Sequence, residues 1–177
     1  MICLGLLTLG LSLASVRMYT RAESQLSEAL TTASQINYSR LVTIALTMSG
    51  ILESMRHNSI KAELFFDHAL QSAKRIEHEY DLCYVYEALG EHYCQCKQWV
   101  MAKKCLDVAV DIAVRRGYRE LGAMANFHLA IAHQGRGEVI AACNRVQEAL
   151  QQFLLIDRYY WRISAVRKLN KQLTNDN

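Results

Sequence analysis

Alanine recurs in this chain at a fixed spacing of 40 residues. Two parallel columns, seven residues apart, consist of Ala22, Ala62, Ala102 and Ala142 and of Ala29, Ala69, Ala109 and Ala149. A fixed period of this size indicates a repeat architecture, in which each repeat is one supersecondary unit that stacks on its neighbours. Small residues seven positions apart lie on one face of a helix, where they allow a second helix to approach closely. We therefore expect an all-α fold of stacked helices.

Further columns with the same period predict one helical hairpin per repeat. A small residue stands twelve positions before each leading alanine, at Gly10, Gly50, Gly90 and Ala130. A large apolar residue stands four positions after it, at Leu26, Phe66, Leu106 and Val146. We expect the small residue of each first helix to face the large residue of the second. The first helices are predicted near residues 3–16, 43–56, 83–96 and 123–135, and the second near 20–37, 59–77, 99–116 and 138–156.

The composition agrees with a nearly all-helical chain. None of the 177 residues is proline and only 8 are glycine, so the residues that most often break helices are scarce. Thr20 with Glu23 predicts a capping box, and Gly135 or Gly137 predicts a left-handed helix C-cap. We expect one domain over residues 1–177. Its repeats are predicted at about 2–41, 42–81, 82–121 and 122–157, followed by a capping helix at about 158–174.

The third block has the most complete motif. It contains Tyr86, Leu89, Gly90 and Tyr93, followed by Ala102, Leu106 and Ala109. This pattern resembles the tetratricopeptide (TPR) family, although the period is 40 rather than about 34 residues and the closing proline is absent. The motif also departs from the family at Ser49 and Glu53 and at Asn126 and His133. Longer repeats of this kind resemble those of bacterial signalling and transcriptional regulators. The resemblance implies an α-solenoid that acts as a cytoplasmic, non-catalytic protein-binding or peptide-binding module, in a regulatory or sensor role.

In the TPR family, side chains of the first helices line a concave groove that binds the partner. By resemblance, the groove residues of this chain are Leu7, Leu11, Ile44, Thr47, Ile51, Tyr84, Glu87, Glu91, Met124, Phe127 and Ile131. The set is mostly apolar, with one acidic pair, and it lacks the basic and amide side chains that hold a peptide carboxylate. The expected occupants are an amphipathic helix or peptide of a partner, a second copy of the chain, or a segment of a longer parent protein.

The first helix is apolar all round, because Leu4, Leu6, Leu7, Leu9, Leu11 and Leu13 cover every side of it. Terminal repeats usually have a polar outer face. We therefore expect either that the protein extends further toward the N-terminus or that this helix forms a homo-oligomeric interface. Residues 1–16 also resemble the core of a signal peptide, but they lack a basic N-terminal region and are short of a membrane span, so the repeat explains them better.

The C-terminal segment is basic. It contains Arg158, Arg162, Arg167, Lys168 and Lys171, interleaved with aromatic residues, and no acidic residue. This mixture is typical of a nucleic-acid or anionic-membrane contact, and also of the solvated face of a capping helix. We favour the capping helix, with its aromatic residues packed on the preceding helix and its basic residues outside. The net charge of +3 does not by itself indicate nucleic-acid binding.

We expect no catalytic site, metal site or cofactor. His92, Cys94, Cys96 and Cys105 are close in sequence, but side chains two positions apart on a helix point in different directions, so Cys94 and Cys96 do not make a metal-binding pair. His128 and His133 are interpreted as buried or edge histidines. Glu87 and Glu91 are one turn apart and favour recognition over acid–base chemistry, since no nucleophile accompanies them. The six cysteines form no disulfide-like framework, which indicates reduced thiols in the cytoplasm.

Overall fold

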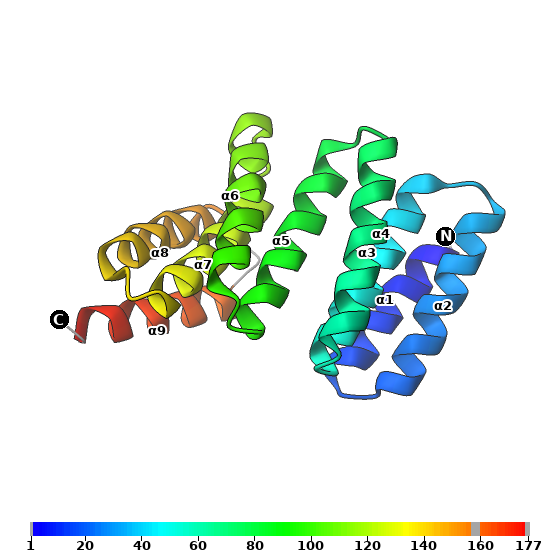
Figure 1. Cartoon of the computed structure of the whole chain (residues 1–177), viewed down its shortest axis with the longest axis horizontal. Coiled ribbons are helices and arrows are strands. Elements are labelled where there is room, and N and C mark those ends of the chain that lie inside the picture. The colour runs from blue at the N-terminus through cyan, green and yellow to red at the C-terminus, as the bar shows by residue number, and fades with distance from the viewer. Residues whose placement is uncertain (1, 157–159, 176–177) are drawn as a thin grey trace. The chain divides into compact units, whose positions relative to one another are not determined.

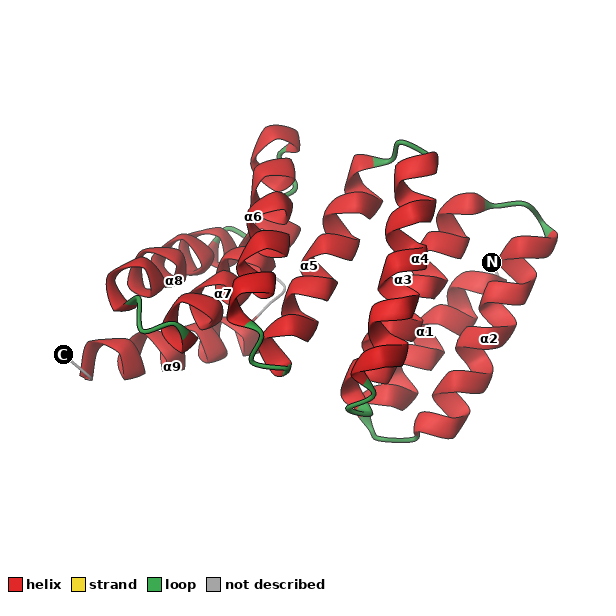
Figure 2. Cartoon of the chain, in the orientation of Figure 1, coloured by secondary structure: helices red, strands yellow, loops and turns green. Residues whose placement is uncertain are grey.

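The computed structural model describes residues 2–156 and 160–175, and the side chains of residues 3–156 and 163–174. Within these ranges every regular element is an α-helix (Figure 2). The helices are α1 (Ile2–Ser15), α2 (Tyr19–Gln35), α3 (Ser39–Met55), α4 (Ser59–Arg75), α5 (Glu79–Gln95), α6 (Trp99–Arg116), α7 (Arg119–Gly135), α8 (Val139–Leu154) and α9 (Tyr160–Asn175). The predicted all-α helical-repeat fold is confirmed.

The observed helix ends lie close to the predicted ones, with one systematic difference. Helices α3, α5 and α7 each begin four residues earlier than the apolar columns indicate, at Ser39, Glu79 and Arg119. The additional first turn carries buried side chains such as Leu41 and Leu121, which contribute to the core although they belong to none of the repeated columns. The helix start is therefore set by the preceding link rather than by the small-residue pattern.

The seven links from α1 to α8 share a residue with positive φ, which recurs every 20 residues. A residue with positive φ occurs at Arg17, Asn37, His57, Glu77, Lys97, Gly117 and Gly137, which is half the period of the side-chain columns. After α3, for example, the His57 N–H donates to the Ser54 carbonyl and the Asn58 N–H donates to the Glu53 carbonyl, both at 2.9 Å. This pair of bonds is a Schellman motif. A 17-residue helix and a three-residue link therefore form the elementary step of the chain.

The last residue of each of these seven links also starts the following helix. The Asn58 carbonyl accepts a hydrogen bond from the Ala62 N–H at 2.9 Å, and Met18 and Glu138 do the same before α2 and α8. No side chain caps the start of α2, whose N-cap is Met18, so the predicted capping box of Thr20 and Glu23 is wrong. Of the two glycines proposed for a left-handed C-cap, Gly137 has a φ of 76°, whereas Gly135 is the last residue of α7.

The predicted pairing of small and large residues within each hairpin is confirmed. A Cβ atom added at Gly50 would lie 2.8 Å from the Phe66 ring, and one added at Gly10 would lie 2.7 Å from Leu26 Cδ2, so neither site has room for a methyl group. In the fourth hairpin, Ala130 replaces the glycine and the smaller Val146 replaces the large residue, and both are fully buried. All eight alanines of the two leading columns are also fully buried. Close helix approach is therefore achieved by matched volumes.

The chain divides into two compact units, an N-terminal unit (Met1–Ala88) and a C-terminal unit (Leu89–Asn177). In the N-terminal unit, successive helices α1 to α4 pack side by side in alternating directions (Figure 1). Its core is built around Leu7, Leu26 and Leu52. In the C-terminal unit, α6 to α9 pack in the same sequential way, and Val146, Phe153 and Val166 lie in the core. Each unit therefore buries its own apolar face.

Candidate binding surfaces

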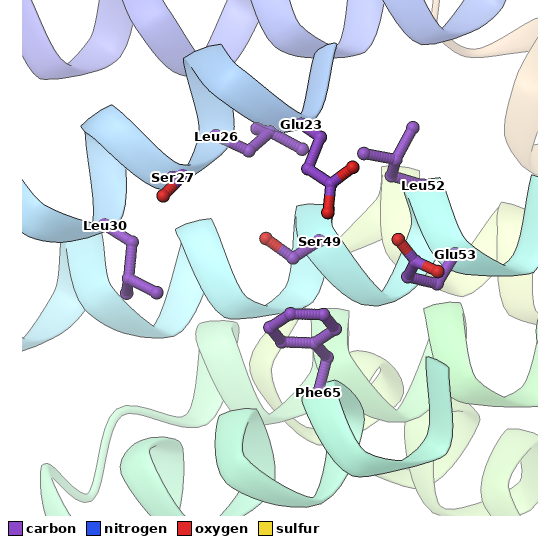
Figure 3. A pocket seen from close by; sticks show the side chains of 8 residues that line it. All are labelled: Glu23, Leu26, Ser27, Leu30, Ser49, Leu52, Glu53 and Phe65. Carbon is purple, nitrogen blue, oxygen red and sulfur yellow. The ribbon is translucent and has the colours of Figure 1, made fainter. Parts of the chain in front are cut away.

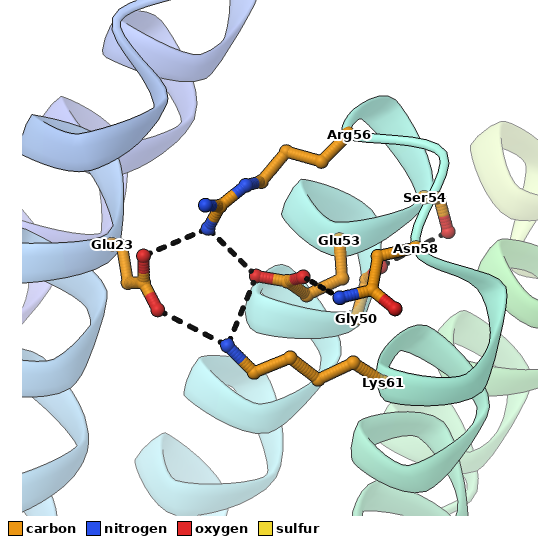
Figure 4. Close-up of polar contacts among 7 residues, drawn as sticks. All are labelled: Glu23, Gly50, Glu53, Ser54, Arg56, Asn58 and Lys61. Carbon is orange, nitrogen blue, oxygen red and sulfur yellow. Dashed lines mark hydrogen bonds and ion pairs between the residues drawn. The ribbon is translucent and has the colours of Figure 1, made fainter.

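A buried carboxylate organises the turn between α3 and α4. Glu53, only 2% exposed, accepts hydrogen bonds from Arg56 Nη1 at 3.0 Å and from Asn58 Nδ2 at 3.0 Å (Figure 4). Lys61 Nζ, in the first turn of α4, lies 3.5 Å from the same carboxylate. Because Arg56 and Asn58 belong to the link, the Schellman turn itself brings two of these donors to the acid. The carboxylate is thus fully engaged inside the protein, as a buried charge requires.

A second carboxylate joins this cluster from the neighbouring hairpin. Glu23 of α2 accepts from Arg56 at 2.7 Å and from Lys61 at 3.2 Å, so both cations bridge two acids (Figure 4). The hydrogen bond from Arg56, followed by that from Lys61, lowers the pKa of Glu23 below its ordinary value. The hydrogen bond to Glu23 raises the pKa of Arg56 and of Lys61 in turn. With two negative and two positive groups, the cluster is neutral and joins α2 to the α3–α4 hairpin.

A small pocket of about 140 Å³ lies beside this cluster (Figure 3). It is lined by Glu23, Leu26, Ser27, Leu30, Ser49, Leu52, Glu53 and Phe65. Its walls are mainly apolar, and the two carboxylates at its edge are already bound by Arg56 and Lys61. The volume is below the roughly 300 Å³ of typical ligand sites. We interpret the pocket as a packing gap between α2 and the α3–α4 hairpin.

A further buried acid joins α3 to the start of α5 within the N-terminal unit. Asp81 accepts two hydrogen bonds from Arg40, Nε to Oδ2 at 3.0 Å and Nη2 to Oδ1 at 3.2 Å. His78 Nδ1 lies 3.1 Å from the same carboxylate. The bidentate hydrogen bond to Asp81 raises the pKa of Arg40. This geometry is that of a structural ion pair.

The turn between α7 and α8 carries a polar cluster of different composition. His133 Nδ1 lies 2.5 Å from Glu138 Oε2, and Arg136 Nε donates to Glu138 Oε1 at 2.8 Å. The hydrogen bond from His133 is the main reason why the pKa of Glu138 lies below its ordinary value. His128 and His133 are both buried, as predicted.

The predicted groove residues differ in how deeply they are buried in the structure. Leu7, Thr47 and Glu87 are buried, so they offer no surface to a partner in this structure. Leu7 belongs to the core of the N-terminal unit, where α3 packs against α1. The other members of the set are half-buried: Leu11, Ile44, Ile51, Tyr84, Glu91, Met124, Phe127 and Ile131.

In the C-terminal unit, the half-buried groove residues are concentrated on one helix. Met124, Phe127 and Ile131 lie on α7 at the spacing of one helix face, and their inner sides pack on the core formed with α8 and α9. Glu91 Oε1 lies 3.9 Å from His128 Nε2, which places a partly exposed carboxylate next to the same helix. This α7 surface, defined by Met124, Phe127 and Ile131, combines apolar anchors with one acidic group nearby.

The six cysteines are thiols rather than disulfides, and most are buried. Burial raises the pKa of Cys83 to about 12 and that of Cys105 to about 11, so both thiols are protonated at neutral pH. Cys94 donates to the His128 carbonyl at 3.5 Å, whereas Cys96 lies 3.8 Å from His92 Nε2, one turn away. Cys94 and Cys96 thus have different partners.

The structure has a column of exposed aliphatic residues that the sequence patterns above did not predict. Ile60, Val100 and Ile140 occupy the second position of α4, α6 and α8 and are 87%, 55% and 80% exposed. Their 40-residue recurrence is visible in the sequence, but the prediction used only the columns of small residues and the column of large residues that faces them. The cluster of Glu23 and Glu53 was not predicted either, because Glu53 replaces the large residue expected at its position.

The basic residues of α9 whose side chains the structure describes lie on the outer side of the helix. Arg167, Lys168 and Lys171 are exposed on α9, whereas Val166, Leu169 and Leu173 are buried in the core of the C-terminal unit. Arg158 lies outside the described residues, and the side chain of Arg162 lies outside the described side chains. The described part of α9 therefore has an apolar inner face and a cationic outer face.

The sequence matches no model of a known protein family, and a comparison with curated proteins finds no match either. Among the described residues, no helix combines the length and apolar character needed to cross a membrane.

Proposed function

We propose that this chain is a non-catalytic protein-binding module and that its α7 surface binds an amphipathic helix of a partner. The observation that supports this proposal is the row of Met124, Phe127 and Ile131. Their side chains are only partly covered by their own unit, and their i, i+3, i+7 spacing is the one with which a helix presents apolar anchors. Burying such a row against a partner helix removes apolar area from water, which is the main favourable term in association.

The carboxylate of Glu91, next to the α7 surface, indicates the charge of the partner. Glu91 is partly exposed, and a lysine or arginine on the edge of the bound helix can pair with it. Such a contact at the rim adds selectivity and accelerates association more than it adds affinity. The expected ligand is therefore an amphipathic helix with three apolar anchors and one basic residue.

The chemistry of the buried polar groups supports binding rather than catalysis. Glu53 and Asp81 are held by cationic side chains within the N-terminal unit, so they are structural acids. Burial keeps the Cys83 and Cys105 thiols protonated, and a protonated thiol is a poor nucleophile. The resemblance to TPR repeats adds the context of a regulatory or sensor segment in a bacterial signalling protein.

A displayed library of amphipathic helical peptides tests the proposal. We expect selection on the wild-type chain to enrich helices with apolar residues at i, i+3 or i+4, and i+7, together with a lysine or arginine. Binding should fall at least tenfold for Phe127→Ala and several-fold for Glu91→Gln, measured by calorimetry. Ile60→Ala, a change at an exposed aliphatic residue of α4, is the matched control and should leave binding unchanged. Equal enrichment by the Phe127→Ala chain would contradict the proposal.

The cationic outer face of α9 supports a second candidate function, contact with nucleic acid in a transcriptional regulator. Three exposed basic residues and the absence of any acid between residues 158 and 175 are the supporting observation. Binding to duplex DNA or single-stranded RNA should then weaken steeply with salt, and charge reversal at Arg167, Lys168 and Lys171 should abolish it. If the wild-type chain binds neither nucleic acid at low salt, this candidate is eliminated.

A further inference from the structure

Helix α1 exposes a face that the equivalent helices bury. On α1 this face, called here the α1 face, consists of Gly5, Leu9 and Ser12 together with Leu4 and Thr8, and all five residues are exposed. Whole repeat periods further along the chain, the residues equivalent to Gly5, Leu9 and Ser12 are all buried: Ala45, Ser49 and Leu52 on α3, and Ala125, Leu129 and Ala132 on α7. Three of the five residues of the α1 face, Gly5, Leu9 and Ser12, therefore occupy positions that pack against protein elsewhere in the chain.

The structure shows what covers these positions on α3. Ser49 and Leu52 face Leu26 and Leu30 of the preceding helix, α2, across the small pocket (Figure 3). The covered side of a first helix in the repeat is thus a helix-packing side. On α1 the same side carries Leu9, which is 48% exposed, and Leu4 beside it is 55% exposed. A Cβ atom added at Gly5 would meet nothing within 4 Å, so there is space for a helix to approach closely at that point.

The polar groups of the α1 face are compatible with burial. The Thr8 hydroxyl donates to the Leu4 carbonyl at 3.1 Å, and the Ser12 hydroxyl donates to the Thr8 carbonyl at 2.8 Å. Because these donors are satisfied within α1, covering them leaves no hydroxyl proton without an acceptor. Helix α1 also contains no charged residue. A dry interface at this face therefore has a small desolvation cost.

The distribution of charged residues indicates which surface can cover the α1 face. In a two-fold interface each patch meets its own copy, so a charged patch faces like charges, whereas the uncharged α1 face meets itself without repulsion. The outer face of α9 is a poor match, because it would place Arg167, Lys168 and Lys171 against a surface with no acid to pair with them. We propose that the α1 face binds the α1 face of a second copy, forming a symmetric dimer with Leu4 and Leu9 buried and Gly5 at the close approach. This inference is independent of the proposed function of α7.

The first experiment measures the mass of the full chain by light scattering after size exclusion. We expect wild type to run as a dimer at about 100 μM and to dissociate on dilution. Leu4→Glu with Leu9→Glu should raise the dissociation constant at least a hundredfold, because four carboxylates would have to be buried together. Both leucines are exposed, so the changes leave the core intact, which a substitution at the buried Leu7 would not do. The matched control is Ile60→Glu with Leu64→Glu, two exposed aliphatic positions on α4, and it should remain a dimer.

A charge-swap experiment tests the symmetry of the interface. Chains carrying Leu9→Glu and chains carrying Leu9→Lys should each be monomeric alone. When mixed, they should form a heterodimer with a dissociation constant within about tenfold of wild type, because Glu then faces Lys across the two-fold axis. Only pairing of the α1 face with itself gives this recovery.

Three results would overturn the inference. A wild-type chain that stays monomeric at this concentration shows that a second copy does not cover the α1 face. A dimer that survives both glutamate changes shows that the interface lies elsewhere. A dimer that is lost in both single variants but not recovered by mixing shows that α1 binds a different surface of the second copy. A charge reversal at Arg167 and Lys168 that alone dissociates the dimer would assign that surface to α9.

Discussion

The α3–α4 and α7–α8 hairpins place polar groups at the same repeat positions. The carboxylate belongs to the first helix in α3–α4 and to the link in α7–α8. In α3–α4 the acid, Glu53, is buried on the first helix and the link supplies its donors. In α7–α8 the buried residue of the first helix is His133, and the link supplies the acid, Glu138. Arg56 and Arg136 occupy equivalent positions, and each binds the acid of its own hairpin. The link geometry therefore brings these positions together, whereas the sequence decides which of them carries the carboxylate.

The two clusters also differ in their reach. The α3–α4 cluster includes Glu23 and so joins its hairpin to α2, whereas Glu138 contacts His133 and Arg136 of its own turn. One is a connection between hairpins, and the other closes a single turn. The comparison indicates that loss of Glu53 affects packing across the N-terminal unit, whereas loss of Glu138 acts locally.

The largest effect is expected from Glu53→Gln. The amide group places a donor opposite donors of Arg56, Asn58 or Lys61 inside the protein, and we expect the free energy of unfolding to fall by about 3 kcal/mol. Urea unfolding followed by circular dichroism gives the total change, and hydrogen exchange shows where protection is lost. Glu138→Gln is the counterpart, with a much smaller loss confined to the α7–α8 turn because Glu138 is partly exposed. Equal losses would refute the distinction.

Exchanging the small residues of the two hairpins should destabilise both. Gly50→Ala forces a methyl group against the Phe66 ring, and we expect a loss of about 2 kcal/mol despite the better helix propensity of alanine. Ala130→Gly loses helix propensity and opens a gap beside Val146, which should also cost about 2 kcal/mol. Adding Val146→Leu to Ala130→Gly recreates the volumes of Gly90 and Leu106 and should recover part of the loss. Calorimetric unfolding measures all of these variants, and a stabilised Gly50→Ala would show that the Phe66 ring moves aside freely.

The links should respond in opposite directions to changes at the positive-φ residue. His57 has a φ of 60° and Gly137 a φ of 76°, at equivalent positions of the two hairpins. His57→Gly relieves backbone strain and should raise the free energy of unfolding by up to about 1 kcal/mol, less the entropy gained by the unfolded chain. Gly137→Ala should lower it by about 1 kcal/mol through conformation alone, because an added Cβ meets no atom within 4 Å. Thermal unfolding resolves the two signs, and a destabilising His57→Gly would indicate a role for the imidazole.

Of these changes, we expect the smallest effect on stability from low pH, which should weaken both clusters. The pKa values of Glu23 and Glu138 lie below the ordinary value of 4.5 in the folded chain, so their stabilising contributions are complete above that pH. These contributions are lost as pH falls through the lowered values, when the folded state must take up protons. Because both carboxylates are partly exposed, solvent screens the effect. Melting temperatures at decreasing pH should fall less steeply for Glu23→Gln and Glu138→Gln than for wild type, and parallel curves would exclude these two groups as the cause.

Much of this fold follows from its sequence because helix packing depends on volume. The alanine columns and the exchange of Gly50 with Phe66 for Ala130 with Val146 are visible in the sequence and determine which helix faces meet. The polar clusters were not predictable in the same way. Glu23 was assigned to a helix cap from local spacing, whereas its partners, Arg56 and Lys61, are more than thirty residues away.

The candidate binding surface was only partly predictable, for a related reason. Position within a helix gives the direction of a side chain, but the neighbouring helix decides whether that side chain is covered. Leu7 was assigned to the groove, yet α3 packs against α1 and Leu7 is buried. The same limit applies to Thr47 and Glu87, whereas Met124, Phe127 and Ile131 keep part of their surface.

In the links from α1 to α8, one residue both closes a helix and opens the next. This double role limits how far the chain tolerates a change in the length of a link. Surface loops usually accept insertions, because their ends can move independently. Here the Asn58 N–H closes α3 while the Asn58 carbonyl opens α4, so one added residue separates two functions that a single residue performs. Natural or engineered variants of this chain should therefore gain or lose whole 40-residue hairpins and not single link residues. The shortest surface segments of the molecule should be among those least able to change their length.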